Sequence, residues 1–433
     1  MITTTLLAAS LRAAAPADAI DRCRNSLCSP GDLDGDGVSD VVVAGRLAAE
    51  VFGWGGCSVP TVRALSGVDG SPLWTAEGQP GFGLEVAAAG DLDGDGIGDV
   101  AVASPRASEV WRVTSGPLVL LSGGSGARLA TVQSPRGIAA FGTSISAGLQ
   151  LVGDPTPDVL VGADRCVVLV DGGLRRPVSL WYRTEAAVVS AGFEVDESGA
   201  LVAPAEARSQ FGRSSSNLEV AGFGIADLDG DGRGEVLIPR FSGIWPAPST
   251  QPLPEFTEPL ALRRGLPLRD GWAATWLVDA SGVPDAVVTT TIDESISATD
   301  LETGEERWSH DYSGGYLQAE GATIARVGDF DGDGLADLAH TANETGMDCD
   351  GGFLVIHSAA DGSVLRQLDV VGLDDSLLPI EGDWCRSGYD VTALDDSDGD
   401  GFPELALHAP RYRQVRLLDG RTLEPRWNVN LGR

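Results

Sequence analysis

A short acidic motif near the start of the chain decides its fold. Residues 31–43 read Gly-Asp-Leu-Asp-Gly-Asp-Gly-Val-Ser-Asp-Val-Val-Val. Counted from Asp32, acids stand at positions 1, 3, 5 and 9, and a glycine stands at position 6, where a sharp turn needs it. The motif therefore predicts a loop whose carboxylates gather around a hard cation. The apolar run that follows predicts a β-strand directly after the loop.

Further complete copies of the motif make it a repeat. They begin at residues 91, 227, 329 and 396, and each keeps the glycine at position 6 and an acid at position 9. Two shorter copies, 154–158 and 279–285, lack most of the acids but keep the apolar run, so we predict that they bind no ion. The predicted metal ligands of the five complete copies are Asp32, Asp34, Asp36, Asp40, Asp91, Asp93, Asp95, Asp99, Asp227, Asp229, Asp231, Glu235, Asp329, Asp331, Asp333, Asp337, Asp396, Asp398, Asp400 and Glu404.

The segments between the acidic copies predict further strands. Another apolar run precedes the loops, and Gly-rich turns between apolar or Trp-bearing runs, as in 65–74, 300–308 and 418–427, predict hairpins. No helical period competes with this pattern. Each repeat of about 60 residues thus holds four strands, and seven repeats predict an all-β, seven-bladed β-propeller of four-stranded antiparallel blades. We expect this propeller to span residues 20–433 as one domain, with the acidic loops between strands 1 and 2.

The repeat resembles the FG-GAP repeats of integrin α-chain propellers and the related bacterial VCBS repeats. Beside the acidic loops, the matching elements are Phe-Gly pairs at 82–83, 141–142 and 223–224, and the run endings at 103–105 and 408–410. The resemblance implies a propeller that carries Ca²⁺ in its acidic loops, about five structural ions in this chain. Each ion would tie strand 1 to strand 2 of its blade.

Calcium suits this loop better than other cations or other calcium motifs do. An EF-hand needs a Glu at position 12 and flanking helices, whereas position 12 of the first copy is Val43, inside a predicted strand. Mg²⁺ keeps its water ligands and rarely uses a cage made only of protein atoms. The alternative is a solvated acidic turn that holds no ion.

Acidic residues far outnumber basic ones. The chain has 63 Asp and Glu against 30 cations, all of them arginine, for a formal net charge of −33. This excess repels phosphate, which excludes a nucleic-acid binder held by general electrostatics and a protein bound to anionic membranes. The five complete loops of four acids account for 20 of the 63, so we interpret about a third of the acidity as metal-ligand chemistry.

The sequence also bears on where the protein works. No run of 18 apolar residues exists, so no transmembrane helix is predicted. Residues 1–19 are apolar and Ala-rich, which fits either a signal peptide or an N-terminal extension. We expect a monomer that is secreted or exposed at the cell surface.

The face opposite the acidic loops is the expected ligand face. In the propellers that the chain resembles, the loop with Cys349 and the link with Cys385 lie on that face, so we predict a disulfide between them. Cys57 has Cys23 or Cys28 as alternative partners. Arginines recur where the second strands leave toward this face; they form either a basic ring for carboxylate or sulfate groups, or pairs with the chain's own acids. These arginines are Arg46, Arg106, Arg165, Arg240 and Arg411.

The sequence contains no recognisable catalytic motif, and we predict that the protein is not an enzyme. The four histidines, His310, His340, His357 and His408, are scattered over different repeats and are expected to pack or to lie on the surface. The favoured hypothesis is a secreted or cell-surface calcium-binding propeller that serves as a binding or adhesion module for a protein or glycan ligand. The alternative is a carbohydrate-active propeller, either a lectin or a polysaccharide-degrading enzyme, that uses the face opposite the calcium loops.

Overall fold

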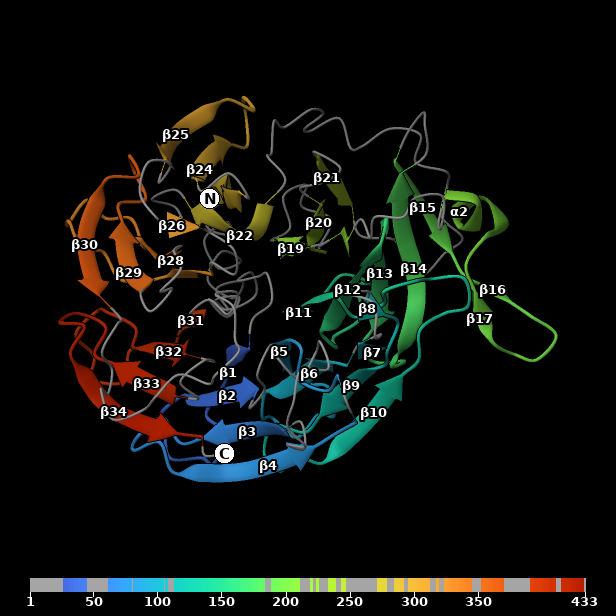
Figure 1. The fold of residues 1–433 in the computed structure, drawn as a ribbon, viewed down its shortest axis with the longest axis horizontal. Helices are drawn as coiled ribbons and strands as arrows, with labels where there is room; N and C mark the ends of the chain where they lie inside the picture. Colours follow the sequence, from blue (N-terminus) through green and yellow to red (C-terminus); the bar gives the residue numbers. More distant parts are fainter. Residues whose placement is uncertain are drawn as a thin grey trace, which may run out of the picture.

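The β-sheets of the chain stand around a central axis in the order of the sequence (Figure 1). The first strand of each sheet lies toward the axis and the last strand toward the rim. The computed structural model describes residues 26–44, 61–79, 81–104, 106–107, 113–183, 188–210, 219–220, 223–225, 233–238, 243–246, 271–278, 284–291, 295–311, 317–318, 323–344, 352–369, 390–409 and 414–431.

Three blades, named here in chain order, form the first half of the ring, and neighbouring strands in each are antiparallel. The first blade consists of β1 (Leu27–Gly31), β2 (Asp40–Ala44), β3 (Thr61–Leu65) and β4 (Pro72–Glu77). The second blade consists of β5 (Val86–Gly90), β6 (Asp99–Ala103), β9 (Leu118–Leu121) and β10 (Arg128–Val132). The third blade consists of β11 (Ser144–Leu149), β12 (Asp158–Asp164), β13 (Cys166–Asp171), β14 (Arg176–Arg183) and β15 (Val188–Gly192), and β18 (Glu219–Val220) pairs with β12.

A three-stranded sheet and three more blades form the second half. The three-stranded sheet consists of β19 (Phe223–Ile225), β20 (Glu235–Ile238) and β21 (Gly243–Pro246). The fourth blade consists of β22 (Gly271–Val278), β23 (Pro284–Thr291), β24 (Ser295–Asp300) and β25 (Glu306–Asp311). The fifth blade consists of β26 (Leu317–Gln318), β27 (Ile324–Arg326), β28 (Leu338–Glu344), β29 (Gly352–His357) and β30 (Val364–Asp369). The sixth blade consists of β31 (Asp390–Ala393), β32 (Leu405–Ala409), β33 (Gln414–Leu418) and β34 (Pro425–Asn430).

The β-propeller and its antiparallel four-stranded blades are confirmed, but the predicted number of seven such blades is wrong. Within the described residues, six sheets have four or more strands, and the sheet at the 227–235 copy has three. Four prolines, at 246, 248, 252 and 254, follow the start of β21. Proline has no N–H to donate to a ladder, so these residues fit a further strand poorly, and the described residues of this repeat form three strands.

The second strand is buried along its whole length in four of the described blades. Every residue of β2, β6, β12 and β32 is buried, because neighbouring blades cover both faces of the sheet. These strands therefore read as continuous apolar runs and not as alternating ones. Buried clusters join adjacent blades: Val42 packs in one cluster with Val100 of the second blade, and Val43 in another with Leu417 of the sixth. The core thus lies between the blades.

Tryptophans of the outer strands link one blade to the next. The Trp74 indole of the first blade donates to the Gly123 carbonyl of the second blade at 2.5 Å. In the same way, Trp308 of the fourth blade donates to Ala359 of the fifth at 3.0 Å. Each buried indole N–H thereby finds a partner across a seam between blades.

The ring closes through contacts of the same kind. Trp427 of the sixth blade donates to the Gly67 carbonyl of the first blade at 2.9 Å, and the Arg63 guanidinium donates to the Leu431 carbonyl. The four strands of the sixth blade all come from residues 390–430, and those of the first blade from residues 27–77. Side chains, and not a strand shared between the two ends, therefore join the first blade to the last.

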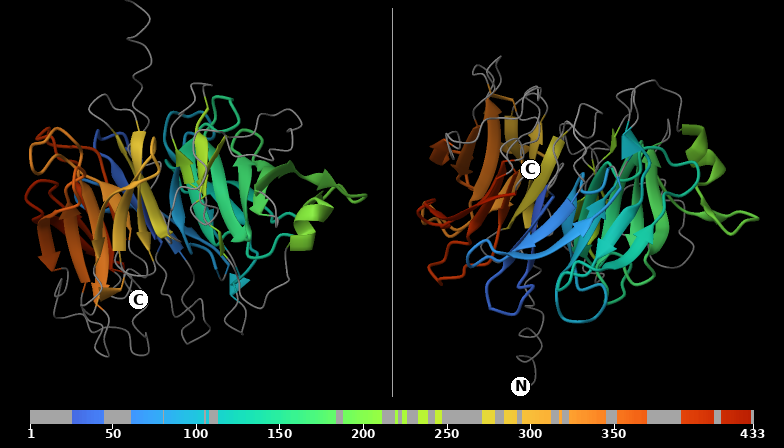
Figure 2. Two further views of the ribbon diagram at one scale, coloured as in Figure 1. Left: turned by 90° about the horizontal axis from the view of Figure 1, so that it is seen from above. Right: turned by 60° about the horizontal axis from the view of Figure 1, so that its bottom comes forward.

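Two excursions leave the ring. The two-stranded ribbon of β7 (Arg106–Ala107) and β8 (Val113–Thr114) is part of the connection from β6 to β9, which pair directly with each other in the second blade. The hairpin of β16 (Glu194–Val195) and β17 (Leu201–Val202), followed by α2 (Ala205–Gln210), projects outward beside the third blade (Figure 2). Among the described residues, no helix is long and apolar enough to cross a membrane.

Candidate metal centres

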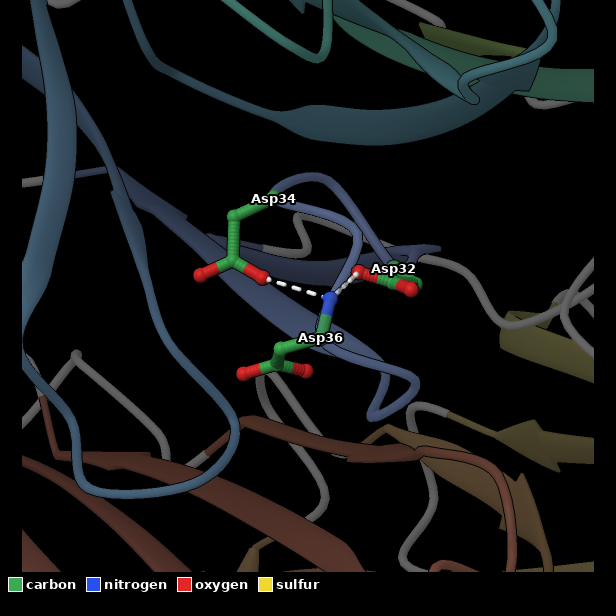
Figure 3. Close-up of side chains that lie close together, drawn as sticks. All are labelled: Asp32, Asp34 and Asp36. Atoms are coloured by element: carbon green, nitrogen blue, oxygen red, sulfur yellow. Dashed lines mark hydrogen bonds between the residues drawn. The ribbon is translucent and has the colours of Figure 1, made fainter.

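The first acidic loop connects β1 to β2, as predicted, and it folds around one carboxylate. The backbone N–H groups of Gly35, Asp36 and Gly37 donate to Asp32 at 2.6, 3.1 and 2.8 Å. The carboxylates of Asp32, Asp34 and Asp36 each place an oxygen within 4.8 Å of the other two. Figure 3 shows these three side chains around the Asp36 backbone N–H, which donates to both Asp32 and Asp34. A local hydrogen-bonded turn therefore brings three negative charges together.

Glycine is needed at two positions of this loop because of its backbone and not because of crowding. Gly35 has a φ of 82° and Gly37 a φ of 90°, both in the left-handed region. A Cβ atom at either position would have no neighbour within 4 Å, so space does not exclude larger residues. L-residues with a side chain rarely adopt this conformation, and the sequence uses glycine in its place.

Similar clusters form in the other complete copies that the structure describes. The backbone N–H groups of Gly332 and Gly399 donate to the first aspartates of their loops at 2.6 and 2.7 Å. In the 227–235 copy, residues 227–231 lie outside the described part. Glu235 is the one predicted ligand of this copy that is described, and it is buried in β20. The converging groups are Asp91 with Asp93 and Asp99, Asp329 with Asp331 and Asp333, and Asp396 with Asp398 and Asp400.

These loops lie at one end of the ring and contact one another. The rings of Phe330, from the 329–337 loop, and Phe402, from the 396–404 loop, pack edge to face with centroids 4.9 Å apart. Ser39 of the first loop donates a hydrogen bond to Asp395, next to the loop of the sixth blade. The acidic loops thus form a belt at one end of the propeller.

The acid at position 9 has a structural task that the sequence did not reveal. Asp40 is fully buried and accepts the Leu33 N–H at 2.7 Å and the Gly67 N–H at 2.9 Å. Asp99 accepts the N–H groups of Leu92 and Gly123 at the same distances. This acid joins the acidic loop to the turn between the last two strands of its blade.

The third blade shows that this task does not need the other acids. Its short loop retains Asp158, which is buried and accepts N–H bonds from Leu151, Val152 and Gly172 at 2.7, 2.9 and 3.0 Å. The acid at position 9 therefore joins the same two turns in a blade with an incomplete loop as well. We call this link, from the acidic loop to the turn between the last two strands, the bracket. Carboxylate oxygens have more than one lone pair, so an acid that accepts N–H bonds can still contribute to a cation.

The electrostatics of the loops favour a bound cation. Burial, with a smaller contribution from the neighbouring acids, raises the pKa of Asp40, Asp99 and Asp337 to about 6. In contrast, the Gly334 N–H holds the pKa of Asp329 below its ordinary value. Ionised and partly desolvated carboxylates therefore stand side by side, and a cation relieves both their repulsion and their desolvation.

The donor set fits calcium. Calcium takes oxygen ligands at about 2.3–2.6 Å, so two oxygens on one ion lie no more than about 5 Å apart. The carboxylate oxygens of each group meet this limit, since all lie within 4.8 Å of one another. Asp32, Asp34 and Asp36 would hold an ion in the first loop, and their counterparts would do so in the others.

Comparison with known proteins agrees with this geometry. Residues 82–118, which include the 91–99 loop and its flanking strands, match the family model of the FG-GAP repeat. The chain carries an FG-GAP repeat. It is 31% identical to integrin alpha-X of Mus musculus over 159 residues and 29% identical to integrin alpha-4 of Xenopus laevis over 170 residues. The recognition of an integrin α-like FG-GAP propeller is confirmed.

These relatives share only part of their length with this chain. Each match covers 34% of this chain, and it spans 13% of integrin alpha-X and 16% of integrin alpha-4. Among solved structures, the exotype rhamnogalacturonan lyase YesX is similar over 92% of this chain and 72% of its own, with 17% identity and a TM-score of 0.47. A likeness of this degree carries no argument about activity.

The structure brings three of the four histidines of the chain together. The ring of His357 lies 5.3 Å from that of His310 and 6.1 Å from that of His340, measured between centroids. Burial lowers the pKa of His340 to about 3 and that of His357 to about 4, so both are neutral at physiological pH. The expected scatter over different repeats is wrong for His340 and His357, which both belong to the fifth blade, and His310 meets them from the neighbouring fourth blade.

The fourth histidine belongs to a polar network where the ring closes. Ser26 donates its N–H to Asp390 Oδ2 at 2.9 Å, and its hydroxyl contacts both Asp390 and His408 Nδ1. The serine stands between the acid and the imidazole, whereas a nucleophilic relay needs the imidazole in the middle. These residues therefore link the first and sixth blades. Sequence reasoning missed them because Ser26 and Asp390 are 364 residues apart.

The closing network makes stability depend on pH. Burial raises the pKa of Asp390 from an ordinary value of 3.8 to about 7, so the folded state holds the proton more tightly than the unfolded state. Its contribution to stability is complete below pH 4 and is lost as the pH rises toward 7, by up to about 1.4 kcal/mol per pH unit. We expect Asp390→Asn, which cannot titrate, to flatten the fall in unfolding free energy between pH 5 and 7. Urea unfolding at both pH values measures this, and equal slopes for variant and wild type would contradict it.

The remaining predicted residues are placed only in part. Arg165 lies in the tight turn between β12 and β13 with a φ of 60°, its Nε atom 3.9 Å from Asp164. The backbone of Arg106 belongs to β7. Cys166 is a buried free thiol, and burial raises its pKa. The predicted ring of arginines and the Cys349–Cys385 disulfide stay predictions, because the other residues concerned lie outside the described part, namely Arg46, Arg240, Arg411, Cys349 and Cys385.

Proposed function

We propose that the chain is a calcium-stabilised binding module that works outside the cell or at its surface. The observation that carries this proposal is the convergence of three carboxylates in each of the four acidic loops whose aspartates the structure places. A binding role is supported by the similarity to integrin α-chains, which extends over a third of the chain.

Calcium would act as a cross-link inside each blade. Asp32, Asp34 and Asp36 would hold it between β1 and β2, and Asp40 already ties the same loop to the turn after β3 through Gly67. The ion supplies the positive charge that three ionised carboxylates lack. The chain's own residues orient the loop in advance, because glycines and backbone N–H groups set its shape.

The proposed ligand face lies at the end opposite the acidic loops. Because acidic loops join strands 1 and 2 at one end, the connections between strands 2 and 3 emerge at the other. In the second blade this connection holds the β7–β8 ribbon. We infer that a protein or glycan ligand binds at this end, where it leaves the calcium belt undisturbed.

A binding screen with calcium and without it tests the proposed function. The purified chain is applied to arrays of extracellular proteins and of glycans, once in about 2 mM calcium and once in EDTA. This calcium concentration is on the order of that at which weak extracellular calcium modules bind the ion. We expect binding to at least one class of ligand in calcium and its loss in EDTA. Turnover of a bound polysaccharide would overturn the module in favour of an enzyme, and binding that is equal in both buffers would overturn the role of calcium.

A further inference from the structure

Each of the six blades has a β-bulge at the same place, between its third and fourth strands or their counterparts. At this point one residue of the outer strand has no partner on the neighbouring strand. The residue is apolar in four blades and arginine in two. In blade order, the bulge residues are Leu73, Leu129, Val178, Arg307, Leu365 and Arg426.

The apolar bulge residues have a packing role. Leu73, Leu129, Val178 and Leu365 are partly buried, and each packs against a cluster of buried apolar side chains. Three of these blades, the first, second and fifth, carry a complete acidic loop. In those blades nothing charged reaches the loop from the bulge.

Arg307 of the fourth blade connects its short loop to the turn between the last two strands, a connection that the position 9 carboxylate makes in other blades. Its Nη1 atom lies 2.9 Å from Asp285 Oδ2, and its Nη2 atom lies 2.7 Å from Asp300 Oδ2. Asp285 ends the incomplete 279–285 loop, and Asp300 begins the turn between β24 and β25. One guanidinium therefore joins the loop to that turn in a blade whose loop lacks most of its acids.

Arg426 of the sixth blade makes the matching contacts beside a complete acidic loop. Its guanidinium lies 3.0 Å from Asp419, the counterpart of Asp300, and 2.7 Å from the buried Glu404. It also pairs with Asp398 and donates to the Ser397 hydroxyl at 3.0 Å. Two of the four predicted metal ligands of the 396–404 loop, at positions 3 and 9, are thus engaged by a cation that belongs to the chain.

We propose that Arg426 acts as a built-in cation that makes the 396–404 loop a weaker calcium site than the loops at 32–40, 91–99 and 329–337. The inference rests on the proposed calcium role of the acidic loops. Calcium at 396–404 must displace charge-assisted hydrogen bonds from Asp398 and Glu404, and it meets a loop with one positive charge already present. No arginine stands at the bulge of the three blades that carry the loops at 32–40, 91–99 and 329–337.

Arg426→Leu, which installs the residue found at the bulge of the first blade, is the direct test. Arg307→Leu is the matched control, because it removes the same charge from the same bulge beside an incomplete loop. Calcium is titrated into each chelator-treated protein with a chromophoric chelator as competitor. We expect the weakest site of Arg426→Leu to tighten roughly tenfold or more relative to wild type, while Arg307→Leu keeps the wild-type affinities. No tightening in Arg426→Leu overturns the inference.

A second pair of variants keeps the arginine in place and so does not depend on the folding of Arg426→Leu. Asp34→Asn removes the position 3 acid of the first loop, and Asp398→Asn removes that of the sixth blade. We expect Asp34→Asn to lose one tight site and Asp398→Asn to keep all of them. Loss of a tight site in Asp398→Asn overturns the inference alone, whereas the absence of calcium binding in wild type and in every variant also overturns the calcium role.

Discussion

We expect removal of calcium with EDTA to lower the melting temperature of the chain by about 9 °C. Each ion held by the folded state at about 100 times its Kd adds about 2.7 kcal/mol, so the three described loops whose blades have no bulge arginine add about 8 kcal/mol. An unfolding entropy of about 2.1 cal/mol/K for each of the 433 residues converts this free energy into the stated shift. Differential scanning calorimetry in calcium, in EDTA and after restoring calcium measures it.

Two variants of the first blade separate the loop effect from the loss of surface charge. Asp34→Asn removes a converging carboxylate and should reduce by about a third the shift that the three described loops without a bulge arginine contribute, since one of them is lost. Asp69→Asn removes an exposed acid that accepts hydrogen bonds from Ser71 within the β3–β4 turn, and it should leave the shift unchanged. A wild-type melting temperature that is the same in calcium and in EDTA would show that the loops are solvated turns.

The second large effect concerns the bracket of the third blade. We expect Asp158→Ala to lower the free energy of unfolding by about 4 kcal/mol, because the N–H groups of Leu151, Val152 and Gly172 lose their acceptor inside the protein, each at a cost of about 1–3 kcal/mol. Since its loop lacks the converging carboxylates, the loss should be the same in calcium and in EDTA. Chemical denaturation in both buffers measures it.

Asp154→Ala is the control for this prediction. Asp154 lies in the same short loop but is only half-buried, and the Thr156 N–H donates to it at 2.8 Å. Its removal should cost about 1 kcal/mol. Equal losses for the two variants, or a loss in Asp158→Ala that disappears in EDTA, would refute the bracket.

The acidic loops could be predicted from sequence because their structure is local. Asp32 receives its hydrogen bonds from residues three to five positions away, and the glycines that allow this turn stand beside it. The apolar runs after the loops predict buried strands for a similar reason, since β2 and its counterparts are covered on both faces. Local chemistry of this kind repeats visibly in a sequence.

Tertiary contacts explain what the sequence could not predict. The bracket of Asp40 depends on Gly67, 27 residues away, so the motif alone predicts only metal binding for this acid. Arg307 and Arg426 both precede a tryptophan in similar segments, 300–308 and 419–427, and this was a signal that sequence comparison alone could have found. Their contacts with Asp285 and Glu404 could not be predicted, because they depend on the bulge, and only the strand register shows the bulge.

The way the ring closes suggests that the folded ring does not depend on which blade comes first in the chain. The first and sixth blades are each built from one contiguous segment, and Trp427 meets Gly67 as Trp74 meets Gly123. The seam between the last blade and the first is therefore of the same type as a seam inside the chain. A circular permutant that joins the present ends and opens between the first and second blades would divide no sheet. Three seams of the described ring, at Trp74, Trp308 and Trp427, are thus of one type, and the last of them joins the two ends of the repeat array.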